Sequence, residues 1–72
     1  MKTKTRYTAL EVAEATRDYT FVEYCAAIDA YETALAERDP AVYINATSRA
    51  ANEARAALAA ADYAVYIVEA NS

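Results

Sequence analysis

Carboxylates are the side chains of this sequence that could do chemistry, and five of them recur at helical spacing. Glu11, Glu14 and Asp18 stand three and four residues apart, and Asp29 and Glu32 repeat the three-residue step. Residues at these spacings share one face of a helix. Carboxylates on one face can exchange protons, hold a divalent cation or attract a basic partner. We call these five residues the acidic ridge.

The residue types that most enzymes need are missing beside this ridge. The chain has no His, no Gly and one Cys, so it offers no Cys/His zinc set, no Ser/His or Cys/His pair and no glycine-rich phosphate loop. Carboxylates could act alone only inside a pocket, and a chain of 72 residues leaves little room for one. We therefore expect no catalytic residues, no metal site and no cofactor, and interpret the ridge as a contact surface.

Charge along the chain is uneven, and this bears on the kind of partner. The first six residues carry three basic side chains, whereas Tyr7 onward has four Arg against eleven acids, a net charge of −7. Nucleic-acid binders show clustered Lys and Arg, so we expect no direct binding of nucleic acid. An acidic body is attracted to a basic surface, and the sequence favours a protein partner that presents one. The alternative is that the acids only keep an Ala-rich chain soluble.

A second candidate surface lies near the C-terminus. Ala56 to Val68 contains one charged residue, Asp62, and a helix that is apolar almost all round needs cover on more than one side. Tyr63, Tyr66 and Ile67 fall outside the stripe that this helix would turn to its neighbours. Because Tyr is favoured at interfaces, we predict that these three residues contact another protein or a second copy, and we expect a homodimer.

These surfaces must be positioned by helices, because the sequence has twenty Ala, one Pro and no Gly. Thr8 and Glu11 form a capping box, and Thr20 with Glu23 repeats the pattern twelve residues later. Residues 39–40 are an Asp-Pro pair, which suits the N-cap and first position of another helix. The predicted helices are residues 9–17, 21–38 and 40–70.

Apolar residues at alternating three- and four-residue steps indicate how these helices pack. The second helix has the series Phe21, Tyr24, Ile28, Tyr31 and Leu35. The third has the series Ile44, Thr47, Ala51, Ala54, Leu58, Ala61, Val65 and Val68. We predict an all-α antiparallel bundle of three helices, with the long C-terminal helix packed against two shorter ones. A break at residues 45–48, which are rich in poor helix formers, would make four.

The remaining features limit the context in which the chain acts. Residues 1–6 are expected to be a flexible basic tail, and residues 7–72 a single helical domain. No apolar run is long enough for a membrane span, and the N-terminus lacks a signal-peptide core, so we expect a cytoplasmic protein, in the host cytoplasm if a phage encodes it. Cys25 is predicted to be a small buried hydrophobic residue.

Together these observations favour a non-enzymatic protein-binding module. A small acidic inhibitor or adaptor that occupies a surface of a larger partner fits best, and a phage or mobile-element inhibitor of host nucleic-acid-handling machinery, of the anti-CRISPR or anti-restriction type, is one setting for it. The alternative is a homo-oligomeric structural or scaffold protein built from the same helices.

Overall fold

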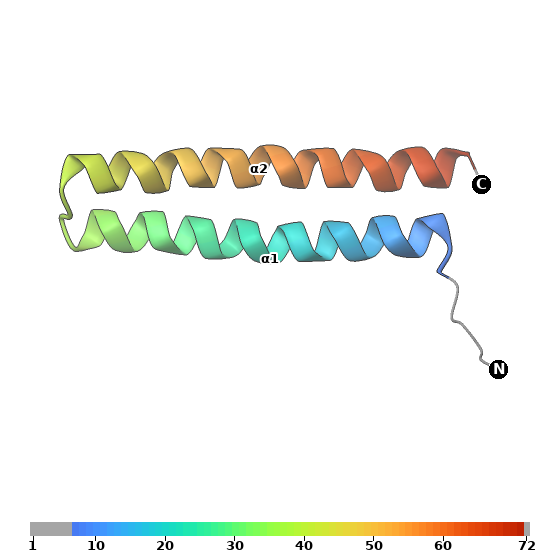
Figure 1. The fold of residues 1–72 in the computed structure, drawn as a ribbon, viewed down its shortest axis with the longest axis horizontal. Helices are drawn as coiled ribbons and strands as arrows, with labels where there is room; N and C mark the ends of the chain where they lie inside the picture. The colour runs from blue at the N-terminus through green and yellow to red at the C-terminus, as the bar shows by residue number, and fades with distance from the viewer. Residues whose placement is uncertain (1–6, 72) are drawn as a thin grey trace.

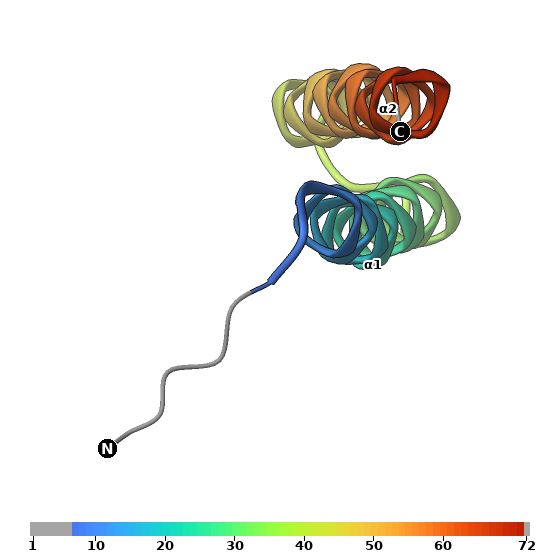
Figure 2. The ribbon, with the colours of Figure 1, turned by 90° about the vertical axis from the view of Figure 1, so that its right-hand side faces the viewer.

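The chain forms an antiparallel hairpin of two helices. The computed structural model describes residues 7–71, in which α1 (Ala9–Ala36) and α2 (Ala41–Ala70) lie side by side along their whole lengths (Figures 1 and 2). The all-α prediction is confirmed. The bundle of three or four helices is not, because the described residues contain two helices. The predicted tail, residues 1–6, lies outside the described part of the chain.

The first predicted helix start is confirmed by its hydrogen bonds. The Thr8 backbone N–H donates to Oε1 of Glu11 (2.9 Å), and the Glu11 N–H donates to Oγ1 of Thr8 (3.1 Å). This reciprocal pair satisfies two N–H groups that the helix itself leaves without partners. A helix therefore begins at Ala9, as the capping pattern predicts.

The second capping pattern and the proposed break in the third helix do not interrupt the helices. Thr20 lies inside α1, and its hydroxyl donates to the carbonyl oxygens three and four residues earlier (2.9 and 3.0 Å). Thr47 does the same inside α2 (2.9 and 3.2 Å), so residues 45–48 stay helical. With both hydroxyls bonded to the preceding turn, neither serves as an N-cap. The prediction of separate helices 9–17 and 21–38 is therefore wrong.

The connection between the helices contains a left-handed residue that is not glycine. Arg38 has φ 57°, and its N–H donates to the Leu35 carbonyl (3.2 Å), while the Asp39 N–H donates to the Ala34 carbonyl (3.0 Å). These two bonds make a Schellman motif, which ends α1 and turns the chain back. Glycine usually occupies this position, but the sequence has none, so an L-residue takes the unfavourable conformation.

The start of α2 differs from the prediction by one residue. Pro40, not Asp39, is the N-cap, and no side chain accepts a hydrogen bond there. The helix begins at Ala41 instead of Pro40. The Asp-Pro pair marks the correct place in the chain, because proline fixes φ near the helical value, but Asp39 does not cap the helix.

The series predicted for the C-terminal helix is confirmed as its packing face. All eight residues from Ile44 to Val68 in that series are buried or half-buried. The facing series on α1 keeps the same three- and four-residue steps over the whole helix. It consists of Leu10, Ala13, Arg17, Thr20, Tyr24, Ala27, Tyr31 and Ala34. We call these two series the seam.

In the second half of α1, several residues that were predicted to pack against α2 are one position away from the residues that do. Tyr24 and Tyr31 lie in the seam, but Phe21 is 53% exposed and Leu35 46% exposed. The repeat that starts at Leu10 passes through Thr20 and Ala34 instead. Because the sequence interpretation began a new helix at Phe21, it missed this continuous repeat.

The core that the seam creates is thin. The buried residues are Ala13, Ala34, Thr47, Ala51, Ala61 and Val65. No large side chain among the described residues is fully buried, and eleven large apolar side chains are exposed. A stable domain needs layers that cover one another's apolar faces, and two helices cover only one face each. The hairpin thus leaves apolar surface available to another molecule.

Candidate protein-binding surface

The continuous α1 aligns three of the five residues of the acidic ridge. Glu11, Asp18 and Glu32 are separated by multiples of seven residues, so they lie along one line of a single helix, with Cys25 between them. Glu14 is half-buried beside the seam, and Asp29 lies on the outer face of α1. The other four ridge residues are exposed.

Local ion pairing neutralises little of this ridge. Nε of Arg17 lies 3.8 Å from Oδ1 of the neighbouring Asp18, so these two residues form an ion pair. An exposed pair of this kind contributes about 0–1 kcal/mol. Oε1 of Glu11 accepts the capping hydrogen bond, and the carboxylate stays exposed to solvent. The ridge therefore presents negative charge along α1.

Tyr63, Tyr66 and Ile67 lie outside the seam on α2, as the sequence indicates. The two tyrosines are exposed, with ring centroids 6.1 Å apart and ring planes inclined by 31°. Rings at this distance attract each other, so the pair forms a defined aromatic surface. Both tyrosines belong to the last turns of α2, which ends at Ala70. They therefore lie near the end of the hairpin where α1 begins and α2 ends, opposite the connection (Figure 1). We call this end the open end.

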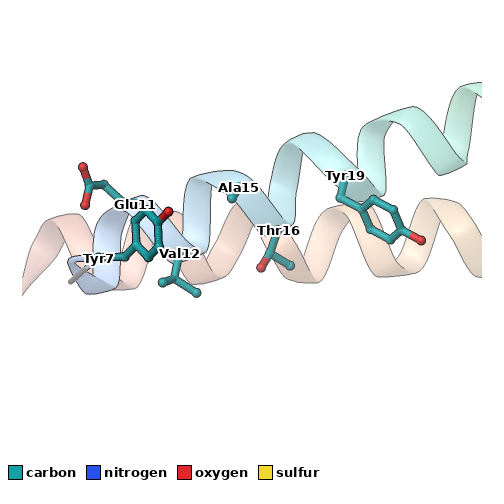
Figure 3. A pocket seen from close by; sticks show the side chains of 6 residues that line it. All are labelled: Tyr7, Glu11, Val12, Ala15, Thr16 and Tyr19. Carbon is teal, nitrogen blue, oxygen red and sulfur yellow. The ribbon is translucent and has the colours of Figure 1, made fainter. Parts of the chain in front are cut away.

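A shallow hollow lies on the outer surface of α1 at the same end. Its volume is about 590 Å³, and the rings of Tyr7 and Tyr19 stand at its two ends (Figure 3). The lining residues are Tyr7, Glu11, Val12, Ala15, Thr16 and Tyr19. Two phenol rings and a carboxylate suit a cationic side chain, which binds aromatic faces and pairs with carboxylates. Sequence reasoning missed this hollow, although the residues recur at steps of three and four.

Tyr19 is also linked to a carboxylate on the next turn. A hydrogen bond to Glu23, together with the negative charge of that carboxylate, raises the pKa of Tyr19 above its ordinary value of 10.0. Tyr19 donates this bond, so the phenol is held in its neutral form. Glu23 thus bonds to Tyr19 within a continuous helix, in which no second helix start exists for it to cap.

The two sides of the seam differ in composition. In each helix, the residues that come directly after every second seam residue lie along one side of the seam. Because the helices are antiparallel, these residues of α1 and α2 lie on the same side of the hairpin. We call them the edge rows. The edge row of α1 is Glu14, Phe21, Ile28 and Leu35, and that of α2 is Ser48, Arg55, Asp62 and Glu69. Glu14, Ile28 and Ser48 are half-buried, whereas the rows on the opposite side are exposed throughout.

Along this side the two halves of the hairpin have different character. Near the open end the edge rows carry three acids, Glu14, Asp62 and Glu69, and Tyr66 lies beside them on α2. Near the connection the edge row of α1 is entirely apolar. The seven-residue spacing of residues 21, 28 and 35 is visible in the sequence. These residues can be assigned to the edge row, and not to the seam, only when the seam is known to pass through residues 20, 27 and 34.

Cys25 does not behave as the sequence suggested. It is exposed and free, so the prediction of a small buried residue is wrong. The continuous seam passes through Tyr24, which leaves Cys25 on the line of the acidic ridge. Over residues 7–71 no group of three or more His, Cys, Asp or Glu side chains could hold a metal ion. In the same part of the chain, neither helix has the length and apolar character that crossing a membrane requires.

Comparison with protein-family models, with curated proteins and with solved structures finds no match to this chain. The surfaces described above are therefore the basis for a functional proposal.

Proposed function

We propose that this protein is a non-enzymatic binding module that occupies a basic surface of a larger protein. The observation that carries the proposal is the gathering of acids and tyrosines at the open end. Glu11, Asp18 and the hollow lie on α1, while Tyr66 and Asp62 lie at the same end of α2. Acidic groups steer a basic partner into place, and tyrosines add contact area at small cost in side-chain entropy.

The chemistry of the hollow supports a cationic anchor on the partner. An Arg or Lys side chain would lie against the ring of Tyr7 or Tyr19 and approach the carboxylate of Glu11. Each cation–π contact at an exposed site contributes about 0.5–1 kcal/mol. An inhibitor that competes with nucleic acid for a basic groove is the form of this proposal that an acidic surface supports best, and an adaptor would use the same contacts.

A homo-oligomeric scaffold is the second candidate, and the thin core favours it. The exposed pair Tyr63 and Tyr66, with Ile67, would then form a contact between copies. The two candidates differ in their response to salt, because a contact between acidic and basic surfaces weakens as salt is added and an apolar contact does not.

A charge-reversal comparison tests the first candidate. The tagged protein is used to capture partners from the producing cells at two salt concentrations, in parallel with the variants Glu14→Lys/Asp18→Lys and Glu37→Lys/Glu53→Lys. The second variant has the same net charge, but its changes lie away from the open end. We expect a captured protein that the first variant loses and the second keeps. Equal capture by all three proteins would show that the open-end acids are not a binding surface.

A further inference from the structure

The apolar side of the hairpin near the connection is a surface that the acidic partner site does not use. Phe21, Ile28 and Leu35 follow one another at seven-residue steps in the edge row of α1. Phe21 and Leu35 are about half exposed although they flank the seam. Tyr24 and Tyr31 lie half-buried between them. A helix with apolar seam residues and an apolar edge row has the face of a bundle helix, which contacts two neighbours and not one.

We propose that a second copy of this chain covers this surface, so that two hairpins form a staggered four-helix bundle centred on Ile28. The two-fold axis crosses α1 at Ile28, and the two α1 helices run antiparallel across it. Phe21 of one copy then lies level with Leu35 of the other, and the two Ile28 residues meet at the axis. Such a contact is isologous, since both copies use the same residues.

The distribution of charge favours this stagger over full overlap. If the hairpins overlapped along their whole lengths, the axis would pass near Val22, and Leu35 would lie level with Leu10 and Glu11 of the second copy. Acids of the open end would then enter the apolar contact. With the axis at Ile28, the overlapping half has no acid in its edge rows, and the acidic open ends extend beyond the bundle on both sides.

Within the overlap, the edge row of α2 consists of Ser48 and Arg55. Arg55 is exposed, and its guanidinium donates a hydrogen bond to Oδ1 of Asn52 on the preceding turn (2.8 Å). The overlapping edge rows therefore bring no two acids together across the contact.

The size of the contact is adequate for a specific dimer. The overlap covers residues 20–36 of α1 and residues 41–59 of α2. The flat contact area is therefore roughly 27 Å long and about 20 Å wide, or about 540 Å² per copy, and interlocking side chains add to it. Two copies then bury more than the ~1,000 Å² that a biological interface needs. The bundle supplies the second layer that the thin core of one hairpin lacks.

Solution mass tests the inference with matched variants. Sedimentation equilibrium over a concentration series compares the unmodified chain with Phe21→Glu/Leu35→Glu and with Val22→Glu/Val42→Glu. The control pair adds the same charge at side chains that are even more exposed, 64% and 81%, on the outer faces. We expect a dimer for the chain and the control, and a monomer or an unfolded monomer for the edge-row variant. A monomeric parent chain, or a dimer of the edge-row variant, would overturn the proposal.

Two further measurements distinguish this arrangement from another dimer. Nitroxide labels on Cys25 should show backbone positions about 13 Å apart, because the residue lies three positions from the axis. Docking through the opposite side would point both labels away from the contact, so that the nitroxides themselves would lie at least about 20 Å apart. In the second measurement, Ile28→Cys in a Cys25→Ala background should form a disulfide between the copies under mild oxidation, because the two Ile28 residues meet at the axis within disulfide distance. Failure to cross-link would refute the stagger.

The outcome is separable from that of the proposed function. If the chain is a dimer but captures no partner in the charge-reversal experiment, the four-helix bundle is supported and the proposed binding function is refuted. If the chain is a monomer whose captured partner is lost when the charges of Glu14 and Asp18 are reversed, the binding function is supported and the four-helix bundle is refuted.

Discussion

Replacement of Arg38 tests the account of the connection between the helices. Arg38 holds φ 57° at the end of α1, a conformation that costs an L-residue about 1–2 kcal/mol because its Cβ approaches the following carbonyl. Glycine avoids this cost but loses about 0.5–1 kcal/mol through its greater freedom in the unfolded chain. We therefore expect Arg38→Gly to be more stable than Arg38→Ala by about 0.5–1 kcal/mol, or roughly 2–8 °C in Tm.

The comparison with alanine isolates the backbone effect, because both variants lose the charge and the side chain of Arg38. Thermal and urea unfolding, followed by circular dichroism at one protein concentration, give the difference. Glu37→Gly and Glu37→Ala form the matched control, since Glu37 has φ −88°. There glycine should be less stable than alanine, as it is in helices generally. If glycine is no more stable than alanine at position 38, the left-handed turn is not the conformation in solution.

Three other perturbations follow from the helix start, the hollow and the seam. Thr8→Ala removes the capping hydrogen bond and should lower the free energy of unfolding by about 0.5–2 kcal/mol, whereas Thr8→Ser should be nearly neutral in urea titrations. Glu23→Gln should move the pKa of Tyr19 down toward its ordinary value, measured from the ¹³Cζ resonance of that tyrosine. Because the pKa of Tyr19 is raised in the folded state, its hydrogen bond to Glu23 stabilises the fold below pH 10, and this stabilisation is lost as pH rises through the pKa of Tyr19. If the pKa of Tyr19 is the same in the Glu23→Gln variant, the hydrogen bond to Glu23 is not its cause. Ala51→Leu overfills the buried seam and should cost about 1–3 kcal/mol, while Ala50→Leu on the exposed neighbour should cost little; equal effects would mean that the seam is misplaced.

Sequence reasoning succeeded where a strong local or periodic signal had no competitor. The capping box at Thr8, the all-α class and the packing face of the C-terminal helix could all be predicted, because each depends on spacing within one element. The eight-residue series from Ile44 to Val68 is long enough to define its own phase. Tyr63 and Tyr66 were placed outside it for the same reason.

It failed where one pattern has two physical meanings. Thr20 followed by Glu23 predicts a helix start, but the same residues fit a helix interior when the hydroxyl bonds to the preceding turn and the carboxylate accepts from Tyr19. This one ambiguity produced a false third helix. It also displaced part of the seam, so Phe21 and Leu35 were assigned to the packing face and Cys25 to the buried residues. The acids of the ridge were identified as a surface, but their alignment depends on the helix being continuous.

The hairpin topology also sets an order in which the molecule closes and opens. Next to the connection, Ala34 and Ile44 are ten positions apart in the sequence, whereas Leu10 and Val68 at the open end are separated by nearly the whole chain. Bringing the distant pair together directly costs about 1.5 kcal/mol more in loop entropy, so the helices associate from the connection outward. The open end is then the last part to form and the first to exchange its amide hydrogens. A partner bound at this end, as we propose, would hold the start of α1 and the end of α2 together, and its binding energy would add to the stability of the segments that open most readily.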